Sequence, residues 1–256
     1  MNALTPLLAC FLGLPTGVYR LHHCVIHHGE GNAHPGDVSS TEAYARDSLP
    51  HFLAYWARHA CGAWLTLPLW AARRRPGLAA RACAGNAAHV ALYLAARRVN
   101  PVAALWLFVV PYWLSSLLFM FGNWSQHVFI NPDAPRAALG MAYTCVNSGD
   151  NQRTYNDGYH ASHHANARTH WSELPAAFMA AAAAHGAADA LAFEGVFFFE
   201  VGAAALLGRR GLAWLARRAI QLPGAPVRTQ PQLVAELQRR LAPIRVAAAG
   251  GAKKAA

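Results

Sequence analysis

Charged side chains are scarce in this sequence. Only 13% of its 256 residues are Asp, Glu, Lys or Arg, whereas 55% are hydrophobic. A typical soluble domain carries about 25% charged residues. The composition therefore favours a protein whose surroundings are partly lipid, with one domain or one domain and a tail.

Several widespread catalytic motifs are missing as well. The chain has no phosphate-binding P-loop, no Gly-x-Gly-x-x-Gly after a strand, no Gly-x-Ser-x-Gly and no His-Glu-x-x-His. Nucleotide-binding, serine hydrolase and zincin functions thus lose their usual support. The five cysteines form no Cys-x-x-Cys pair, and several lie in apolar segments. We expect buried thiols in a reducing compartment.

The net charge of +10 has two interpretations. A nucleic-acid-binding protein would gather basic side chains on one face, with aromatic or polar readers between them. Here the arginine pairs flank apolar runs, as they do beside membranes. These groups are Arg73–Arg75, Arg97–Arg98, Arg209–Arg210 and Arg217–Arg218. The sequence predicts membrane lipid, and no nucleic acid, as a partner.

Four apolar segments set the expected topology. Residues 102–122 are uncharged and about 31 Å long as a helix, enough to cross a bilayer. We expect 78–96 to be the partner span, 52–72 to lie along the interface, and 3–19 to be a further membrane helix. No sustained period-2 alternation predicts strands. The expected fold class is therefore all-α.

The C-terminal third is more polar. Residues 176–207 are alanine-rich but contain acidic residues, so we expect cytosolic or interfacial helices that cap a site. Leu233, Leu237 and Leu241 recur at i, i+4 and i+8, which predicts one amphipathic helix. The end, with Lys253 and Lys254, is expected to be disordered and resembles a dilysine retrieval signal of endoplasmic reticulum proteins.

The segment 155–171, YNDGYHASHHANARTHW, contains the densest histidine cluster. On a helix, His160, His163 and His164 fall on one face within about one turn. Their neighbours are mostly polar. Three imidazoles aimed at one point suit a first-row metal ion with nitrogen ligands. The alternative is a solvated polar helix.

A second cluster comes first in the chain. His23 and His27 stand at i and i+4, on the same side of a helix. His28 lies about 100° further round and joins them only if the helix tightens, bulges or ends, which Gly29 permits. Glu30 beside them is a candidate hydrogen-bond acceptor for an imidazole, with a solvated loop acid as the alternative.

A third pair, Asn123 and His127, again at i and i+4, follows the apolar run 102–122. A lone histidine is more often structural than a ligand. However, eight of the 14 histidines fall in three short clusters, which favours a shared metal site.

At these clusters the chain resembles the membrane fatty acid desaturase superfamily, in an algal or plant-like branch. HHCVIHHGEGN (22–32), GNWSQH (122–127) and NDGYHASHHANARTHWSELP (156–175) carry the resemblance, which covers most of residues 5–205. It implies an integral membrane helical bundle with a cytosolic, metal-binding histidine cap. It also implies a non-haem di-iron centre, with O2 as co-substrate. The implied iron ligands are His23, His27, His28, His127, His160, His163 and His164.

Further roles are implied by the same resemblance. Asn123 occupies the position of a water-linked ligand. Asp157, Arg168 and His170 are polar neighbours that support the site or simply face solvent. The implied activity is the introduction of a double bond into an acyl lipid or acyl-CoA, with electrons from cytochrome b5 or a ferredoxin. The implied location is the endoplasmic reticulum membrane with a cytosolic active-site face.

The superfamily also has an earlier histidine box, which this sequence does not supply. We expect residues 1–210 to form an N-terminally incomplete desaturase-like membrane domain, and 211–256 a basic amphipathic helix with a disordered tail. Seven imidazoles plus Asn123 should leave one iron short of ligands, so we expect incomplete iron binding. The alternatives are a lipid hydroxylase or ketolase, a truncated non-catalytic relative, or a histidine-rich metal transporter.

Overall fold

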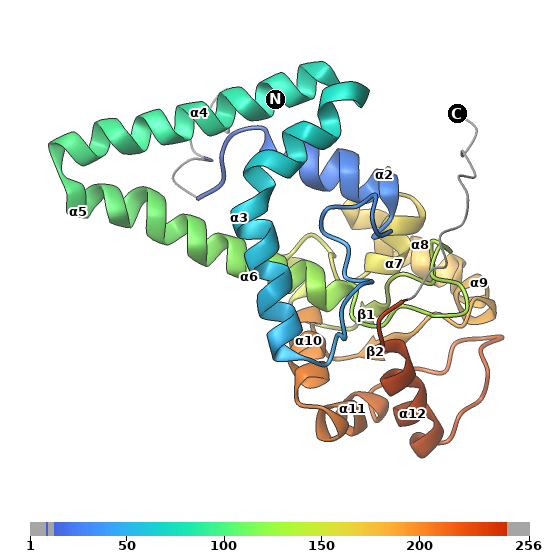
Figure 1. Ribbon diagram of the computed structural model, residues 1–256. Coiled ribbons are helices and arrows are strands. Elements are labelled where there is room, and N and C mark those ends of the chain that lie inside the picture. Colours follow the sequence, from blue (N-terminus) through green and yellow to red (C-terminus); the bar gives the residue numbers. More distant parts are fainter. Residues whose placement is uncertain (1–8, 10–12, 245–256) are drawn as a thin grey trace.

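The computed structural model describes residue 9 and residues 13–244 (Figure 1). Most of the helix expected over 3–19 lies outside these residues, and within the described part the prediction is wrong for residues 13–17, which form turns with positive φ at Gly13 and Gly17. The expected disordered end and the lysine pair 253–254 also lie outside them.

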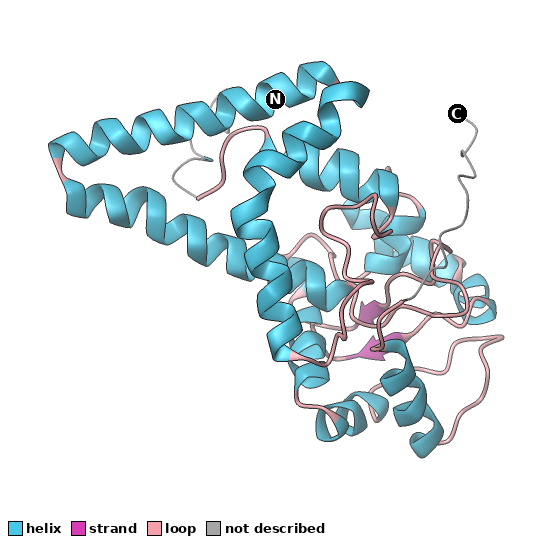
Figure 2. Cartoon of the chain, viewed as in Figure 1, coloured by secondary structure: helices cyan, strands magenta, loops and turns pink. Residues whose placement is uncertain are grey.

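The described chain consists of a group of long helices and a second region of short helices and strands (Figures 1 and 2). The long helices are α3 (Leu49–Arg74), α4 (Pro76–Val99) and a continuous rod made of α5 (Pro101–Ala104), η3 (Leu105–Val109) and α6 (Val110–Gln126). Local signals explain their ends. The Ser48 side chain accepts a hydrogen bond from the His51 N–H to start α3, and Asn100 caps α5 between two helices that each begin with proline.

The rod Pro101–Gln126 is the one helix in the described residues that is long and apolar enough to cross a membrane. It contains the predicted span 102–122, and at 26 residues it is about 39 Å long. The predicted partner segment 78–96 lies in α4, which does not meet the same criterion; Arg81, Asn86 and His89 reduce its hydropathy. Large apolar side chains are nonetheless exposed along these helices, among them Leu69, Val99 and Trp106.

The other region contains a small sheet, so the all-α prediction is wrong in this detail. Strand β1 (Thr144–Val146) pairs in parallel with β2 (Ala192–Glu194), and Cys145 lies opposite Phe193. Each strand has only three residues, and β1 is buried throughout. Such strands show no alternation of polar and apolar residues, which is why the pattern missed them.

The remaining helices surround this sheet. They are α7 (His160–Ala165), α8 (Leu174–Ala180), α9 (Ala182–Ala187), α10 (Phe198–Leu206), α11 (Arg209–Ala216) and α12 (Gln230–Arg240). The predicted amphipathic helix is confirmed as α12, where Leu237 and the following Leu241 are fully buried and Leu233 packs against the same core. The predicted helices over 176–207 are interrupted by β2.

Arg46 joins this C-terminal helix to the loop before α3. Its guanidinium is fully buried and donates only to main-chain oxygens. The acceptors are the carbonyls of Thr41, Glu42, Tyr44, Val128, Arg240 and Ala242. Five guanidinium N–H donors thus tie three distant segments together.

The expectation of buried cysteines is wrong for most of those described. Cys145 is buried, but Cys24, Cys61 and Cys83 are exposed. Cys61 and Cys83 lie in α3 and α4, where an apolar outer face accepts a small apolar side chain without burying it.

Candidate metal centre

A π-helix, η2 (Arg20–His27), positions the first histidine cluster. A π-helix bonds residue i to i+5, so side chains five apart share a face. His23 and His28 accordingly bring their Nε2 atoms to 3.2 Å. The sequence predicted that His23 would pair with His27. Instead His23 pairs with His28, and His27 points toward His127. The chain leaves this helix through the three-residue α2 (His28–Glu30) and through Gly31, whose φ of +61° favours glycine.

Four imidazoles form the first histidine group, here called the inner group. His127, at the end of α6, lies at its centre, with its Nε2 3.1 Å from His27 Nε2 and 3.2 Å from His160 Nε2. His164 Nε2 is 3.1 Å from His160 Nε2. His27, His127 and His160 are buried and His164 is half-buried. All four ligand atoms lie within 4.8 Å of one another.

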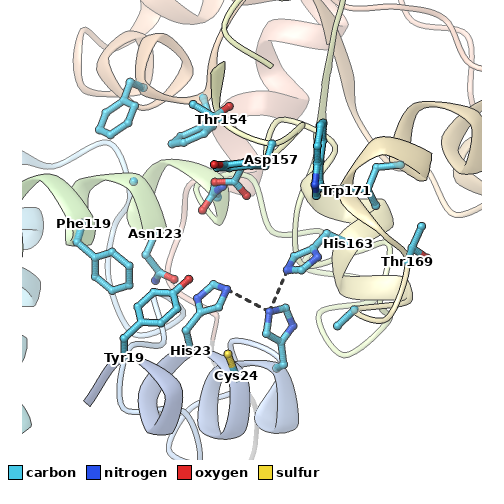
Figure 3. Close-up of a pocket in the computed structure, with 18 of the residues that line it drawn as sticks. Tyr19, His23, Cys24, Phe119, Asn123, Thr154, Asp157, His163, Thr169 and Trp171 are labelled. Carbon is cyan, nitrogen blue, oxygen red and sulfur yellow. Dashed lines mark hydrogen bonds between the residues drawn. The ribbon is translucent and has the colours of Figure 1, made fainter. Parts of the chain in front are cut away.

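Three imidazoles form the second, or outer, group. His28 Nε2 lies 3.2 Å from His23 Nε2 and 3.0 Å from His163 Nε2, as the dashed lines in Figure 3 show. All three side chains are half-buried. The two groups adjoin, since the ring centroids of His28 and His164 are 4.9 Å apart. The structure thus brings together all seven histidines of the predicted set.

Hydrogen bonds on the opposite ring nitrogens orient two members of the inner group, His27 and His127. His27 Nδ1 lies 2.6 Å from Asp37 Oδ2, and neither side chain is exposed. His127 Nδ1 lies 2.9 Å from the Met141 carbonyl oxygen. Both partners can only accept, so Nδ1 carries the proton and, in the neutral ring, Nε2 presents a lone pair to the centre. This arrangement is typical of metal-bound histidines.

The spacing fits a metal ion. Two lone pairs that face each other repel, so His27 Nε2 and His127 Nε2 at 3.1 Å need a cation between or beside them. With metal–nitrogen bonds of about 2.1 Å, adjacent ligand atoms lie about 3.0–3.4 Å apart. The Nε2 contacts in both groups fall between 3.0 and 3.2 Å. The residues present therefore suit a nitrogen-rich site for two ions.

Electrostatics keep the imidazoles in their metal-binding form. Burial, together with the neighbouring imidazoles, lowers the pKa of His23 to about 3 and that of His28 to about 4. The pKa values of His127, His160 and His164 are lowered for the same reasons. Burial alone would raise the pKa of Asp37, but pairing with His27 and the Ser39 hydrogen bond lower it, so its carboxylate stays charged.

Asn123 and Asp157 lie beside the outer group (Figure 3). The Asn123 amide donates to the Tyr55 hydroxyl at 2.6 Å and to the Ser39 carbonyl at 3.2 Å. Asp157 Oδ1 is 3.4 Å from His160 Nδ1, and burial raises the pKa of its carboxyl. Arg168 and His170 are exposed, and His170 accepts a hydrogen bond from the Ser172 N–H instead of approaching the histidines.

A cavity of about 630 Å³ opens beside the outer group. His23, His28 and His163 all line it, and Figure 3 labels His23 and His163 at its wall. Its apolar wall comes from α6, α8 and α10 through Leu118, Phe119, Gly122, Leu174, Phe198 and Phe199, and its polar wall includes Thr154, Asp157 and Thr169. A ligand with an apolar tail and a polar end can therefore lie against the three imidazoles.

Some residues of the centre were not predicted. Asp37 follows His27 by ten residues in a turn, where spacing gives no signal, and it takes the role considered for Glu30. Tyr55, which supports Asn123, lies in an apolar helix. His22 is buried but belongs to neither group; its ring packs 4.7 Å from that of His59 on α3.

Comparison with known proteins gives one finding. The sequence model of the family described as fatty acid desaturase matches residues 1–193. This range contains all seven histidines, Asn123 and Asp157. Neither the curated proteins nor the solved structures include a match to the chain.

Proposed function

We propose, from the premise that the chain belongs to the fatty acid desaturase family, that it is a membrane-bound, oxygen-dependent acyl-lipid desaturase-like oxidoreductase. The observation that carries the proposal is the convergence of seven imidazoles in two adjoining groups beside an amphipathic cavity. The substrate class follows from the family and from the shape of this cavity.

Two iron ions are the proposed cofactors. The inner group, His27, His127, His160 and His164, would hold one, and the outer group, His23, His28 and His163, would hold the other. Imidazole nitrogens suit iron. Iron with O2 supplies the oxidising power that hydrogen removal from an unactivated CH2–CH2 unit requires, which no side-chain acid or base provides.

The chain's own residues prepare the site. Asp37 and the Met141 carbonyl hold His27 and His127 in the tautomer that points a lone pair inward. Tyr55 and Ser39 fix the amide of Asn123 at the cavity wall, and we propose that its side chain meets the outer ion through a water. Asp157, whose Oδ1 lies 3.4 Å from His160 Nδ1, places a carboxyl group beside the outer group at the cavity wall.

We propose one orientation for an acyl chain in the cavity. Its hydrocarbon tail would lie between Phe119 of α6 and Phe198 and Phe199 of α10, where it displaces water from apolar surface. Its polar end would lie toward Thr154 and Thr169. The carbons between would pass the outer imidazoles, which places the reacting bond next to the ligands with the most open surroundings.

Membrane attachment is part of the proposal. The rod Pro101–Gln126 would cross the bilayer, with Asn100 at the far side and His127 at the side of the metal centre. We place the desaturase-like domain at residues 1–210 and the protein in the endoplasmic reticulum membrane, with the histidines facing the cytosol. Cytochrome b5 or a ferredoxin would supply electrons there.

Product analysis tests the function. Membranes containing the protein, iron, a reductase system and acyl lipids should yield a lipid two hydrogens lighter, detected by mass spectrometry. The His163→Ala variant should not form it. A product one oxygen heavier would instead support the hydroxylase alternative, and absence of product with full iron content would support a non-catalytic relative.

A further inference from the structure

The two histidine groups differ in how their rings are held. In the inner group, Nδ1 of His27 and of His127 donates to Asp37 and to the Met141 carbonyl. Among the described residues, no hydrogen bond of this kind reaches the three imidazoles of the outer group. Metal ligands hold their geometry only when packing or hydrogen bonds fix their rings. A different contact must therefore fix the outer ligands.

Tyr19 makes such a contact with His23. The two ring centroids lie 5.3 Å apart, and the ring planes are within 11° of parallel. Tyr19 directly precedes η2 and stands four residues before His23, so both side chains leave the same side of the helix. Both also line the cavity, where Figure 3 labels them. Rings at this distance and angle attract one another as offset stacks, which restricts rotation of the His23 ring.

The Tyr19 ring is held in turn from α6. Phe119 meets it edge-on, with ring centroids 5.7 Å apart and planes at 65°. In the part of the chain that the structure describes, the Tyr19 hydroxyl makes no hydrogen bond, so its ring supplies the contacts. Tyr19 is also 46% exposed. Its replacement should therefore leave no closed void and should affect the neighbouring imidazole more than the fold.

We infer that Tyr19 is a positioning residue of the outer metal site, whose ring keeps the His23 imidazole in the plane that brings its Nε2 to 3.2 Å from that of His28. The inference rests on the proposed function, since it takes the two histidine groups as sites of metal ions. Tyr19 does not bind the ion and acts through His23. Because the ring and not the hydroxyl makes the contact, phenylalanine should replace tyrosine and an aliphatic side chain should not.

Chelator competition on purified protein loaded with ferrous iron tests the inference without turnover. The wild type should show two binding steps, of which the weaker belongs to the half-buried outer group. Tyr19→Leu keeps apolar bulk but removes the ring, so it should weaken this step about 2- to 10-fold, the range for one aromatic contact. The stronger step should be unchanged. Tyr19→Phe should match the wild type in both steps.

Tyr93→Leu is the matched control. Tyr93 lies in α4, where its ring meets Phe108 of the rod edge-on with centroids 6.5 Å apart. Its ring contacts no imidazole among the described residues, and it does not line the cavity. Both binding steps of this variant should equal those of the wild type. The control thus separates loss of a ring beside a ligand from loss of a tyrosine–phenylalanine contact elsewhere.

The proposed two-ion centre fails if the wild type lacks the weaker step. If both steps are present and Tyr19→Leu leaves them unchanged, the role of Tyr19 is refuted while the centre stands. Equal weakening of both steps, or a Tyr19→Phe variant as weak as Tyr19→Leu, would also overturn the inference.

If Tyr19→Leu does not fold, Phe119→Leu takes its place. This variant keeps Tyr19 but removes the edge-on contact that holds its ring. It should weaken the same step by a smaller factor and leave the stronger step unchanged. Unchanged affinity at both steps would overturn the inference.

Discussion

His28 and His163 bring their Nε2 atoms to 3.0 Å from one another, although 135 residues separate them in the chain. The outer group therefore depends on two parts of the chain, the consecutive helices η2 and α2, which carry His23 and His28, and the short helix α7, which carries His163. The inner group contains a helix-to-helix contact of the same kind, between His27 and His127. Its ligands are more numerous and more deeply buried, and this difference has measurable consequences.

The two histidine groups should release metal at different rates. The inner group offers four largely buried imidazoles, whereas the outer group offers three half-buried ones beside an open cavity. Dialysis of iron-loaded protein against a chelator should remove the outer ion first, leaving about one iron per chain by elemental analysis. His163→Ala should hold only the retained ion and His127→Ala only the exchangeable one. Loss of both irons at one rate would contradict this asymmetry.

Asp37→Asn should weaken metal binding at the inner group. Asn cannot match the charge that stabilises the His27 N–H, and loss of such a partner typically costs 10- to 100-fold in metal affinity. Competition with a chromophoric chelator measures this affinity. Glu30→Gln is the control, since Glu30 makes no described hydrogen bond to an imidazole, and it should retain wild-type affinity. Equal losses in both variants would show that general charge, not orientation, governs binding.

The metal-free protein should lose stability on mild acidification. The folded-state pKa values of His23 and His28 are lowered to about 3 and about 4, whereas unfolded histidine titrates near 6.5. Between these values the unfolded chain binds protons that the folded chain does not, so stability is complete above pH 6.5 and falls toward pH 4. Each histidine contributes about 1.4 kcal/mol per pH unit at most.

Thermal midpoints at pH 7.5 and pH 4.5 measure this effect. The double variant His23→Gln, His28→Gln removes two of the titrating groups, so the difference between its midpoints should be smaller than that of the wild type. An equal difference would show that other groups dominate acid unfolding.

Arg46→Lys should be strongly destabilising. A lysine has three donors and no fork, so at least three of the six carbonyl acceptors, four of which are buried, would lose this partner, and each buried one left unpaired costs about 1–3 kcal/mol. We expect a loss of about 3 kcal/mol or more in denaturant unfolding. Arg239→Lys is the matched control: Arg239 is partly exposed and pairs with Asp133 and Glu236, where a surface ion pair contributes less than about 1 kcal/mol. Similar losses would argue against the role of Arg46.

The two ends of the rod Pro101–Gln126 should face opposite sides of the membrane. Arg240 and Ala242 are bonded to Arg46 in the same region as the metal centre, which places residue 242 on the histidine side. A glycosylation tag attached after Ala256 should stay unmodified in microsomes, while one inserted between Val99 and Asn100 should be modified. Modification of the C-terminal tag would refute a cytosolic metal centre.

Local sequence patterns predicted much of the centre. The apolar run 102–122 gave the candidate span, the i, i+4, i+8 leucines gave α12, and the clustering of imidazoles brought seven positions together. These features depend on periodicity within one helix, which a single sequence displays. The same logic grouped His23 with His27, because an α-helix was assumed where the chain forms a π-helix.

Contacts between segments distant in the chain could not be predicted in this way. Asp37 reaches His27 from a loop, Tyr55 reaches Asn123 from α3, and β1 pairs with β2 across 48 residues, since Thr144 lies opposite Ala192. None of these partners carries a spacing or composition signal, because each contact is set by tertiary packing. From the sequence, polar residues in loops or apolar helices were therefore predicted to lie at the surface, or no role was predicted for them.

The Arg46 contacts also impose an order on biosynthesis. All seven imidazoles have been synthesised by residue 164, yet the Arg46 guanidinium gains its last two acceptors, at Arg240 and Ala242, only when translation has passed residue 242. Until then the loop that carries Asp37 lacks its anchor to α12. The nascent chain can thus gather its histidines early, but the loop between α2 and α3 gains its anchor only after translation has passed α12.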